Sequence, residues 1–476
     1  MPQAELKFQL IKGDRVDADS TPRVDYRDAL SVNITGIIRQ IFDIQGYMLE
    51  QPGIAAFGTG EGNDRGGLWN ERLETHFRVS GDKFISVDNN GVSTVLGTVL
   101  GTPQVSLPYS FNTQAIIAGG NYYLYDPTNG FRPVIDVDLG KPIDAIWVDG
   151  LYFFTDGDFL YHTDIDDEGS IDPLQFATSE FSPDPTVGVG KTTDNKVIAF
   201  NRYTIEYFEN RATETFAFAR LPSRAIKYGL VATHLKAEIG GQWYFVGGPK
   251  EGSLSIYKLG VGQVVEIASR EITVRLAEYN ETELANAVME SRVMDGYPAL
   301  IIHLPNETLF YNIKVAGFSG SDQAWSLLES TGGTQWRAIN GAFIPDLSQS
   351  GKWIYGDKTT SQLGEIDVTL ATQYGDKVPC FLYTPFYQIE TASLDELEIE
   401  SIPGFNTTND ATVFFALSYD GALYGAEVPL QYGIPGDIGA RFIARRLGYV
   451  RNYFTMRLRW VSASRMAFSR GRFLYG

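Results

Sequence analysis

The stretch IWVDGLYFFTDGDFLYH, residues 146–162, contains three short runs of aromatic and β-branched residues separated by two Asp-Gly dipeptides. Such runs favour β-strands, and Asp-Gly is a preferred hairpin turn because both residues tolerate positive φ. The stretch therefore predicts three antiparallel strands that are joined by tight turns.

Looser copies of this unit recur along the chain, beginning near Phe84, Tyr122, Val197, Trp243, Leu300 and Trp353. The mean step between copies is about 45 residues, which is typical of the four-stranded blades of a β-propeller. We therefore predict an all-β chain containing a β-propeller of six or seven blades. A ring of blades is more often a platform for binding than the seat of one particular reaction.

The 476 residues divide into three predicted parts. Residues 56–370 contain the blade-like hairpins, with a helical insertion near 280–291 that begins at the capping-box pattern of Asn280–Glu283. Residues 1–55 do not fit the pattern and are expected to close or flank the propeller. The strands after residue 370 are longer and alternate in polarity, so residues 371–476 are predicted to form a C-terminal β-sandwich.

Charge is distributed unevenly along the chain. The net charge is −19, yet the last 36 residues contain nine arginines and no acidic residue. The acidic remainder should repel nucleic acid over most of its surface. We predict that four of the arginines lie at a subunit or adaptor interface, where arginine pairs bidentately with carboxylates: Arg441, Arg445, Arg446 and Arg451.

Two further arginines, Arg457 and Arg459, share one face of a predicted strand. They are expected to pair with the alternating carboxylates of Glu396, Glu398 and Glu400, or to cover sheet edges. A nucleic-acid patch is the alternative, although aromatic residues for base stacking do not share the arginine face.

One acidic loop resembles a calcium site. Asp164, Asp166 and Glu168 provide oxygen ligands at alternate positions, as Ca²⁺ prefers, but the twelfth position is Gln175 and flanking helices are missing. A solvated hairpin tip explains the loop as well. We expect no metal and no cofactor, with these three residues as a weak calcium candidate.

Motifs for catalysis are also missing from the sequence. The four histidines lack ligand neighbours at metal-binding spacing, and no Gly-x-Ser-x-Gly elbow occurs. The paired carboxylates of a glycosidase need proximity in space only, so Asp156, Asp158 and Asp164 would be the first to test. We therefore expect no enzyme, and a glycan-binding or glycan-cleaving propeller stays as the alternative. A cytoplasmic scaffold propeller is a third possibility.

The remaining composition fits folding in a reducing cytoplasm. The single cysteine, Cys380, excludes an intrachain disulfide and lies in an apolar stretch that predicts burial. Neither a secretory signal nor an apolar run of membrane-spanning length is visible, so no membrane partner is expected.

Several segments resemble the tail hub proteins of short-tailed, lambdoid-type bacteriophages, which are also called tail accessory factors or packaged-DNA stabilisation proteins. The likeness covers nearly the whole length and is strongest from 195 to 390. Its segments are Gly46–Leu49, Pro52–Ile54, Thr204–Phe208, Ala287–Ser291, Leu300–Pro305, Tyr355–Lys358 and Leu363–Asp367. The run Met289–Pro305 is the most specific of them.

The resemblance implies a structural protein of the virion tail that is assembled in the host cytoplasm. Such hubs form a sixfold ring below the portal and its adaptor, or head-completion protein. They continue the DNA channel, hold the needle or plug that retains packaged DNA, and dock tailspikes or fibres. DNA would pass through without specific binding, because an acidic wall presents few counter-charges to phosphates.

Overall fold

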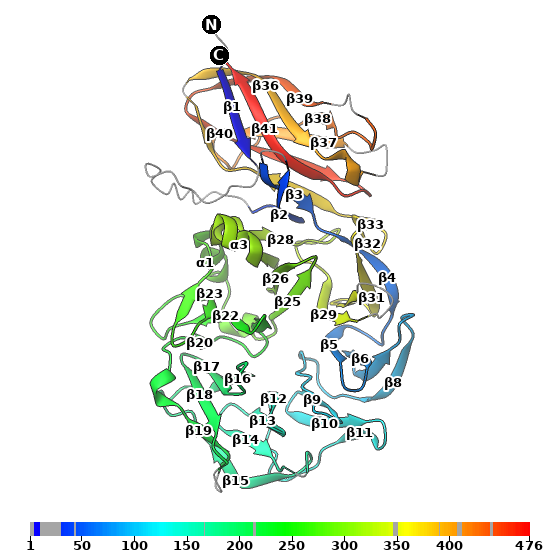
Figure 1. Ribbon diagram of the computed structural model, residues 1–476, viewed down its shortest axis with the longest axis vertical. Helices are drawn as coiled ribbons and strands as arrows, with labels where there is room; N and C mark the ends of the chain where they lie inside the picture. Colours follow the sequence, from blue (N-terminus) through cyan, green and yellow to red (C-terminus); the bar gives the residue numbers. More distant parts are fainter. Residues whose placement is uncertain are drawn as a thin grey trace.

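The chain folds into a β-propeller with a β-sandwich beside it (Figure 1). This arrangement confirms the predicted fold class. In the computed structural model, the described residues are 4–9, 30–41, 44–165, 167–212, 216–345, 351–389, 391–406, 412–437 and 441–476. Among them, no helix is long and apolar enough to cross a membrane.

Seven small, mainly antiparallel sheets follow one another around the propeller in the described part of the chain. Blade 1 contains β5 (Asp64–Asn70), β6 (Thr75–Ser80), β7 (Lys83–Val87) and β8 (Ser93–Thr98), and blade 2 contains β9 (Gln114–Ala118), β10 (Asn121–Asp126) and β11 (Gly130–Pro133). Blade 3 contains β12 (Asp144–Val148), β13 (Leu151–Thr155), β14 (Leu160–Thr163) and β15 (Ile171–Ala177). Blade 4 contains β16 (Thr186–Lys191), β17 (Val197–Asn201), β18 (Ile205–Asn210) and β19 (Phe218–Arg220). Blade 5 contains β20 (Gly229–Leu230), β21 (Lys236–Ile239), β22 (Gln242–Gly248), β23 (Ser255–Leu259) and β24 (Val264–Glu266). Blade 6 contains β25 (Val288–Met294), β26 (Tyr297–His303), β27 (Thr308–Asn312) and β28 (Trp325–Leu327). Blade 7 contains β29 (Ala338–Ile344), β30 (Lys352–Asp357) and β31 (Gln362–Asp367).

A strand from near the N-terminus completes blade 7. The strand β4 (Gly53–Thr59) pairs antiparallel with β31, and Ile54 lies opposite Ile366. The short strand β32 (Thr372–Gln373) pairs with the other side of β4 and is followed by β33 (Asp376–Lys377). The ring is therefore closed by backbone hydrogen bonds between segments about 300 residues apart in sequence.

The two Asp-Gly dipeptides of blade 3 form different turns. Asp149 and Gly150 have φ values of 49° and 89°, so a two-residue turn joins β12 to β13, as predicted. At the second, the Asp156 carboxylate accepts hydrogen bonds from the backbone N–H groups of Asp158 and Phe159. This side chain thus holds a longer loop between β13 and β14.

The β-sandwich takes strands from both ends of the chain. One sheet has the order β2 (Ile34–Ile41), β3 (Ile44–Glu50), β41 (Ala467–Tyr475), β36 (Ala392–Ser401) and β39 (Phe442–Val450), with β1 (Ala4–Gln9) also paired to β41. The other has the order β34 (Pro379–Tyr383), β40 (Tyr453–Val461), β37 (Thr412–Ser418) and β38 (Val428–Gln431), with β35 (Tyr387–Gln388) on β40. The N-terminal segment, expected to close or flank the propeller, thus contributes β1–β3 to the sandwich and β4 to blade 7.

The helices are short. They are α1 (Arg270–Leu276), α2 (Glu281–Leu284), α3 (Ile313–Ser319) and the 3₁₀ turns η1 (Pro222–Arg224), η2 (Ser321–Gln323) and η3 (Pro403–Phe405). The predicted capping box is present, because Asn280 accepts from the Glu283 N–H and Glu283 accepts from the Asn280 N–H. The predicted helix near 280–291 was too long: α2 ends at Leu284, and Val288 already pairs with His303 in blade 6.

Candidate functional site

An arginine–glutamate ladder covers the exposed face of β36. Arg441 donates to Glu398 at 2.7 Å and Arg445 donates to Glu396 at 2.8 Å. From β41, Arg470 reaches Glu400 at 2.6 Å and Arg472 also reaches Glu398. The hydrogen bond from Arg441 is the largest cause that lowers the pKa of Glu398. Two of the four predicted interface arginines, Arg441 and Arg445, therefore already have partners within the chain.

The other two predicted interface arginines, Arg446 and Arg451, are exposed. Neither guanidinium group has a hydrogen-bond or ion-pair partner among the described residues, although the Arg451 carbonyl accepts a hydrogen bond from Thr391. Arg446 lies where the register between β36 and β39 shifts, and it has a φ of 58°. Such a bulge re-aims a side chain away from its sheet neighbours. The structure thus separates the four candidates into two paired and two unpaired arginines.

The predicted partners of Arg457 and Arg459 were wrong. Both arginines lie on β40, in the sheet opposite β36, and both pair with Glu427, Arg457 at 3.0 Å and Arg459 at 2.5 Å. Their guanidinium groups also stack over Tyr424 and Phe414. The alternation of β40 was recognised in the sequence, but its position in the other sheet was not.

The weak calcium candidate does not gather around one point. Asp164 accepts a hydrogen bond from Ser170 at 2.7 Å, and Glu168 accepts one from Thr113 of the preceding blade. Asp166 lies outside the described residues. Within the described ranges, no group of three or more His, Cys, Asp or Glu side chains is arranged to hold a metal ion.

The carboxylate at the start of β12 joins four blades. Asp144 accepts hydrogen bonds from Ser106 at 2.6 Å, from the Val189 N–H at 2.8 Å and from Lys236 at 2.7 Å. Asp144 and Lys236 are both nearly inaccessible to solvent. A buried pair with further hydrogen bonds satisfies both charges, so this carboxylate has a structural role in the inner ring.

His303 is a buried histidine, as expected from its apolar run. Its Nε2 lies 2.7 Å from the Glu290 carboxylate, and its ring stacks on Trp336. Burial lowers the pKa of His303 to about 4, despite the opposing effect of Glu290. Cys380 is also fully buried, and burial beside Glu50 raises the pKa of its thiol. Such a thiol is poorly suited to act as a nucleophile.

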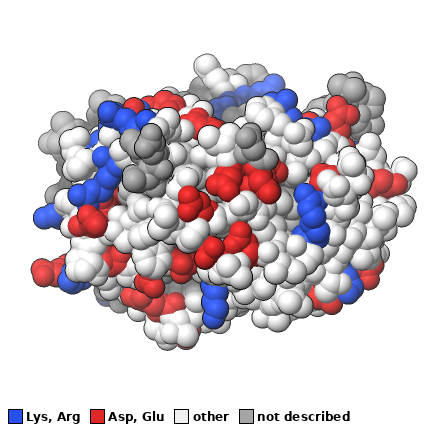
Figure 2. Space-filling view, turned by 90° about the horizontal axis from the view of Figure 1, so that it is seen from below, with Lys and Arg blue, Asp and Glu red and all other residues white. Residues whose placement is uncertain are grey.

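The outer part of blade 3 is both acidic and apolar at its surface. Residues 134–184 contain thirteen acidic side chains, of which Asp144 is buried, and one lysine. Within this span, Ile135 is 91% exposed and Val137 is 97% exposed, and Ile165 and Leu174 are also exposed. Figure 2 shows carboxylates gathered over the face seen from below, where β14 and β15 lie in Figure 1. We call residues 134–184 the acidic edge.

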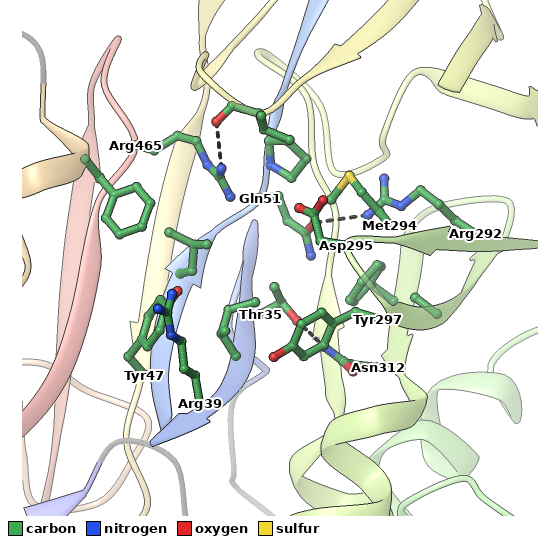
Figure 3. Close-up of a pocket in the computed structure, with 17 residues that line it drawn as sticks. Thr35, Arg39, Tyr47, Gln51, Arg292, Met294, Asp295, Tyr297, Asn312 and Arg465 are labelled. Carbon is green, nitrogen blue, oxygen red and sulfur yellow. Dashed lines mark hydrogen bonds between the residues drawn. The ribbon is translucent and has the colours of Figure 1, made fainter. Parts of the chain in front are cut away.

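A cleft of about 410 Å³ lies where β2 and β3 face β25 and β26 (Figure 3). Its apolar lining includes Ile37, Tyr47, Leu49, Phe310 and Phe405. These side chains come from the sandwich, from blade 6 and from the turn after β36. The cleft therefore exists only where the two parts of the molecule meet.

The polar lining of this cleft is cationic. Three arginines, Arg39, Arg292 and Arg465, line it together with a single carboxylate, Asp295. Arg465 is buried and donates to the Glu50 carbonyl at 2.6 Å, and burial lowers the pKa of its guanidinium. The lining of this cleft is therefore cationic, although the net charge of the chain is −19.

Sequence comparison identifies the family of this two-part chain. The family model described as the β-propeller of bacteriophage P22 Gp10 matches residues 6–371, and the model of its β-sandwich matches residues 380–474. The chain belongs to the bacteriophage P22 Gp10 family. Within the Gp10 family, the tail hub protein gp10 of Salmonella phage P22 is 27% identical over 470 residues, with 94% of each chain covered.

Solved structures with similar shapes are more distant from this Gp10-family chain. The streptogramin B lyase structure has 12% identity and a TM-score of 0.42, covering 67% of this chain and 97% of its own. The N-terminal domain of Nup159 has 10% identity and a TM-score of 0.43, covering 71% and 99%. Likenesses at this level carry no argument about function.

Family membership and the P22 relative make this Gp10-family protein a structural tail hub of the virion. The resemblance to podovirus tail hubs is thereby confirmed, as is the predicted place in the tail. The cleft was not predicted from the sequence. Its walls come from residues about 250 positions apart, and no local pattern signals their meeting. The sequence feature that lies nearest to the cleft is the pair of segments Gly46–Leu49 and Pro52–Ile54, which resemble the tail hub family and flank Gln51.

Proposed function

We propose that this protein forms a ring of six copies that continues the DNA channel of the portal. The ring would sit below the portal adaptor, hold the needle or plug that retains packaged DNA, and dock tailspikes or fibres. The proposed role is structural, without catalysis. The observation that carries the proposal is the match to a phage tail hub over 94% of the chain.

The charge distribution supports passage of DNA without binding. A body with a net charge of −19 presents carboxylates to a polyanion, so phosphates would find few counter-charges along such a wall. The acidic edge, with thirteen acidic residues and one lysine, is strongly one-sided in charge. We propose that carboxylates of this kind face the channel or its partners, where they repel DNA and admit basic groups.

The unpaired arginines suit a contact between proteins. A closed ring of identical subunits needs a heterologous interface, with a different patch on each side of the contact. The side chains of Arg446 and Arg451 are exposed on or beside β39 and lack partners among the described residues, so carboxylates of a neighbouring subunit or of the adaptor can pair with them. We propose that these two, rather than Arg441 and Arg445, form the assembly contact.

Electron cryo-microscopy of tails purified from virions tests the proposal. Class averages viewed along the tail axis should show a sixfold ring of this protein that is continuous with the portal. Particles assembled without the protein should package DNA and then lose it, as measured by nuclease sensitivity. A protein that stays monomeric beside portal complexes and leaves DNA retention unchanged would contradict the proposal.

A further inference from the structure

The cleft between β2–β3 and β25–β26 contains an unsatisfied buried donor. Gln51 is 9% exposed, and its Oε1 accepts a hydrogen bond from Arg292 at 3.1 Å. Because a guanidinium group can only donate, this bond fixes the orientation of the Gln51 amide. The Nε2 group must then point away from Arg292, and it has no partner in the described structure. Buried donors are normally paired, so this one is an unmet polar group in the wall of the cleft.

The surroundings of this donor select a negatively charged acceptor. Figure 3 shows Gln51 between Arg465 and Arg292, with Arg39 lower on the same side as Tyr47. Arg39 is exposed and its side chain forms no hydrogen bond or ion pair among the described residues, whereas Arg292 and Arg465 are buried. Carboxylates form the strongest hydrogen bonds with such groups. The aromatic and aliphatic wall adds room for an apolar side chain next to the carboxylate.

The acidic edge exposes a segment in which carboxylates stand next to apolar side chains. Ile135, Asp136, Val137 and Asp138 alternate apolar and acidic residues in a loop after β11. Asp136 is already engaged within the chain, because it accepts hydrogen bonds from the N–H groups of Asp138 in its own loop and of Ile171 at the start of β15. The carboxylate of Asp138 is exposed and free of any described partner, beside the almost fully exposed Val137. Isolated exposure of large apolar residues is ordinary, but two in one acidic loop form a patch.

We propose that the cleft receives residues 135–138 of a second copy of this chain. The carboxylate of Asp138 pairs with Arg39, while Val137 packs on the apolar wall. The two surfaces lie far apart on one molecule, so they cannot satisfy each other internally (Figure 1). Complementary patches at separate places generate a heterologous contact, which closes into a ring at a suitable angle. The inference rests on the ring of the proposed function and names its contact.

Assembly of the full-length protein tests the contact. Oligomers would be counted by mass photometry for the wild type and for Val137→Lys, Asp138→Arg and Arg39→Glu. Each change should reduce the ring fraction at least tenfold without shifting the melting temperature. The matched controls are Val261→Lys, at a position that is 91% exposed, and Lys250→Glu, which is also exposed; both should assemble normally. Asp138→Arg combined with Arg39→Glu should restore rings.

A peptide measures the cleft independently of the ring. A fluorescent peptide copying residues 133–140 should bind the wild-type protein in anisotropy titrations, and its Asp136→Asn, Asp138→Asn version should bind at least tenfold more weakly. Arg39→Glu should weaken binding of the acidic peptide. Absence of peptide binding, or rings that survive all three changes, would overturn the inference while leaving the ring itself standing. A wild type that forms no rings yet binds the peptide would instead contradict the proposed function.

Discussion

The Trp460 indole donates its N–H to Oε2 of Glu50 at 2.8 Å, across 410 positions of sequence. Both side chains are buried, and the Met466 N–H donates to the same carboxylate oxygen at 3.2 Å. Glu50 ends β3, just before the chain crosses into β4 of the propeller. This hydrogen bond therefore links the segment between β3 and β4, where the chain passes from the sandwich to the propeller, to the core of the sandwich.

Glu50 should make stability depend on pH. Burial raises its pKa from 4.5 to about 7, against opposing hydrogen bonds from Trp460 and Cys380. Between these two values the folded state holds more protons than the unfolded state, so the free energy of unfolding falls as pH rises from 4.5 to 7. The contribution of this group is about 3 kcal/mol over the interval.

Glu50→Gln tests this dependence because glutamine can still accept from Trp460. Urea unfolding at pH 4.5, 6 and 8 should show a smaller loss of stability with pH for the variant than for the wild type. Below about pH 4.5, where the glutamate becomes protonated in both the folded and the unfolded state, the two proteins should depend on pH in the same way. Parallel pH profiles for the two proteins would contradict the assigned pKa.

The buried pair of Arg78 and Asp64 should be a strong determinant of propeller stability. The two groups are 2.7 Å apart, and Arg78 also donates to the Asn340 carbonyl of blade 7 at 2.8 Å. Removing one partner leaves an uncompensated buried charge, so Arg78→Met should destabilise by about 3–5 kcal/mol. Chemical denaturation measures the loss, and the exposed pair Arg211–Glu209 supplies the control. Arg211→Met should change stability by less than about 1 kcal/mol.

The two unpaired sandwich arginines should matter for assembly and not for folding. Arg446→Glu with Arg451→Glu should reduce incorporation into tails, because both side chains are exposed and bind nothing described within the chain. The melting temperature should stay within about 2 °C of the wild type, as for most surface changes. Incorporation is measured by the stoichiometry of purified tails. Normal stoichiometry would remove these two residues from the assembly interface.

Arg441→Glu with Arg445→Glu is the informative comparison. These changes place like charges beside Glu398 and Glu396, so they should lower the melting temperature of the isolated protein itself. Any loss of assembly would then follow from the weaker fold. A double change of Arg445 and Arg446 would mix the two effects, because only Arg445 has a carboxylate partner in the described structure.

Replacement by alanine should have very different effects on stability at two glycines. Gly150 has a φ of 89° but open space around its Cα, so Gly150→Ala should cost about 1 kcal/mol from backbone strain alone. A Cβ at Gly247 would lie 1.7 Å from the Gly229 carbonyl oxygen in the neighbouring strand. Gly247→Ala should therefore destabilise by more than about 4 kcal/mol or prevent folding. Thermal unfolding of both variants checks the order, and equal melting temperatures would refute it.

Local patterns predicted the propeller well because each blade is built from neighbouring residues. The runs around Asp149 and Gly150 form strands and a turn as expected, and the Asn280 capping box is present. The same reasoning made the helix after Asn280 too long. Ala287 and Val288 fit a helical apolar face, but Val288 gains a backbone partner in β26 that a helix could not provide.

Partners in the sandwich were not predictable in the same way. Glu396, Glu398 and Glu400 were correctly expected to meet arginines, yet the arginines come from β39, from the residue just before it and from β41, rather than from β40. Alternation along a strand states which residues share a face, and it does not state which strand lies beside it.

The sequence alone determined that this chain is a repeated array of short strands, acidic over most of its length and arginine-rich at its C-terminus. Strand and turn preferences and net charge are properties of neighbouring residues, so they can be read without a structure. Tertiary structure decided that β1–β3 complete the sandwich, that β4 closes the propeller and that a cationic cleft forms between them. These features depend on pairing between segments hundreds of residues apart, for which many registers are compatible with the same local pattern and packing selects one.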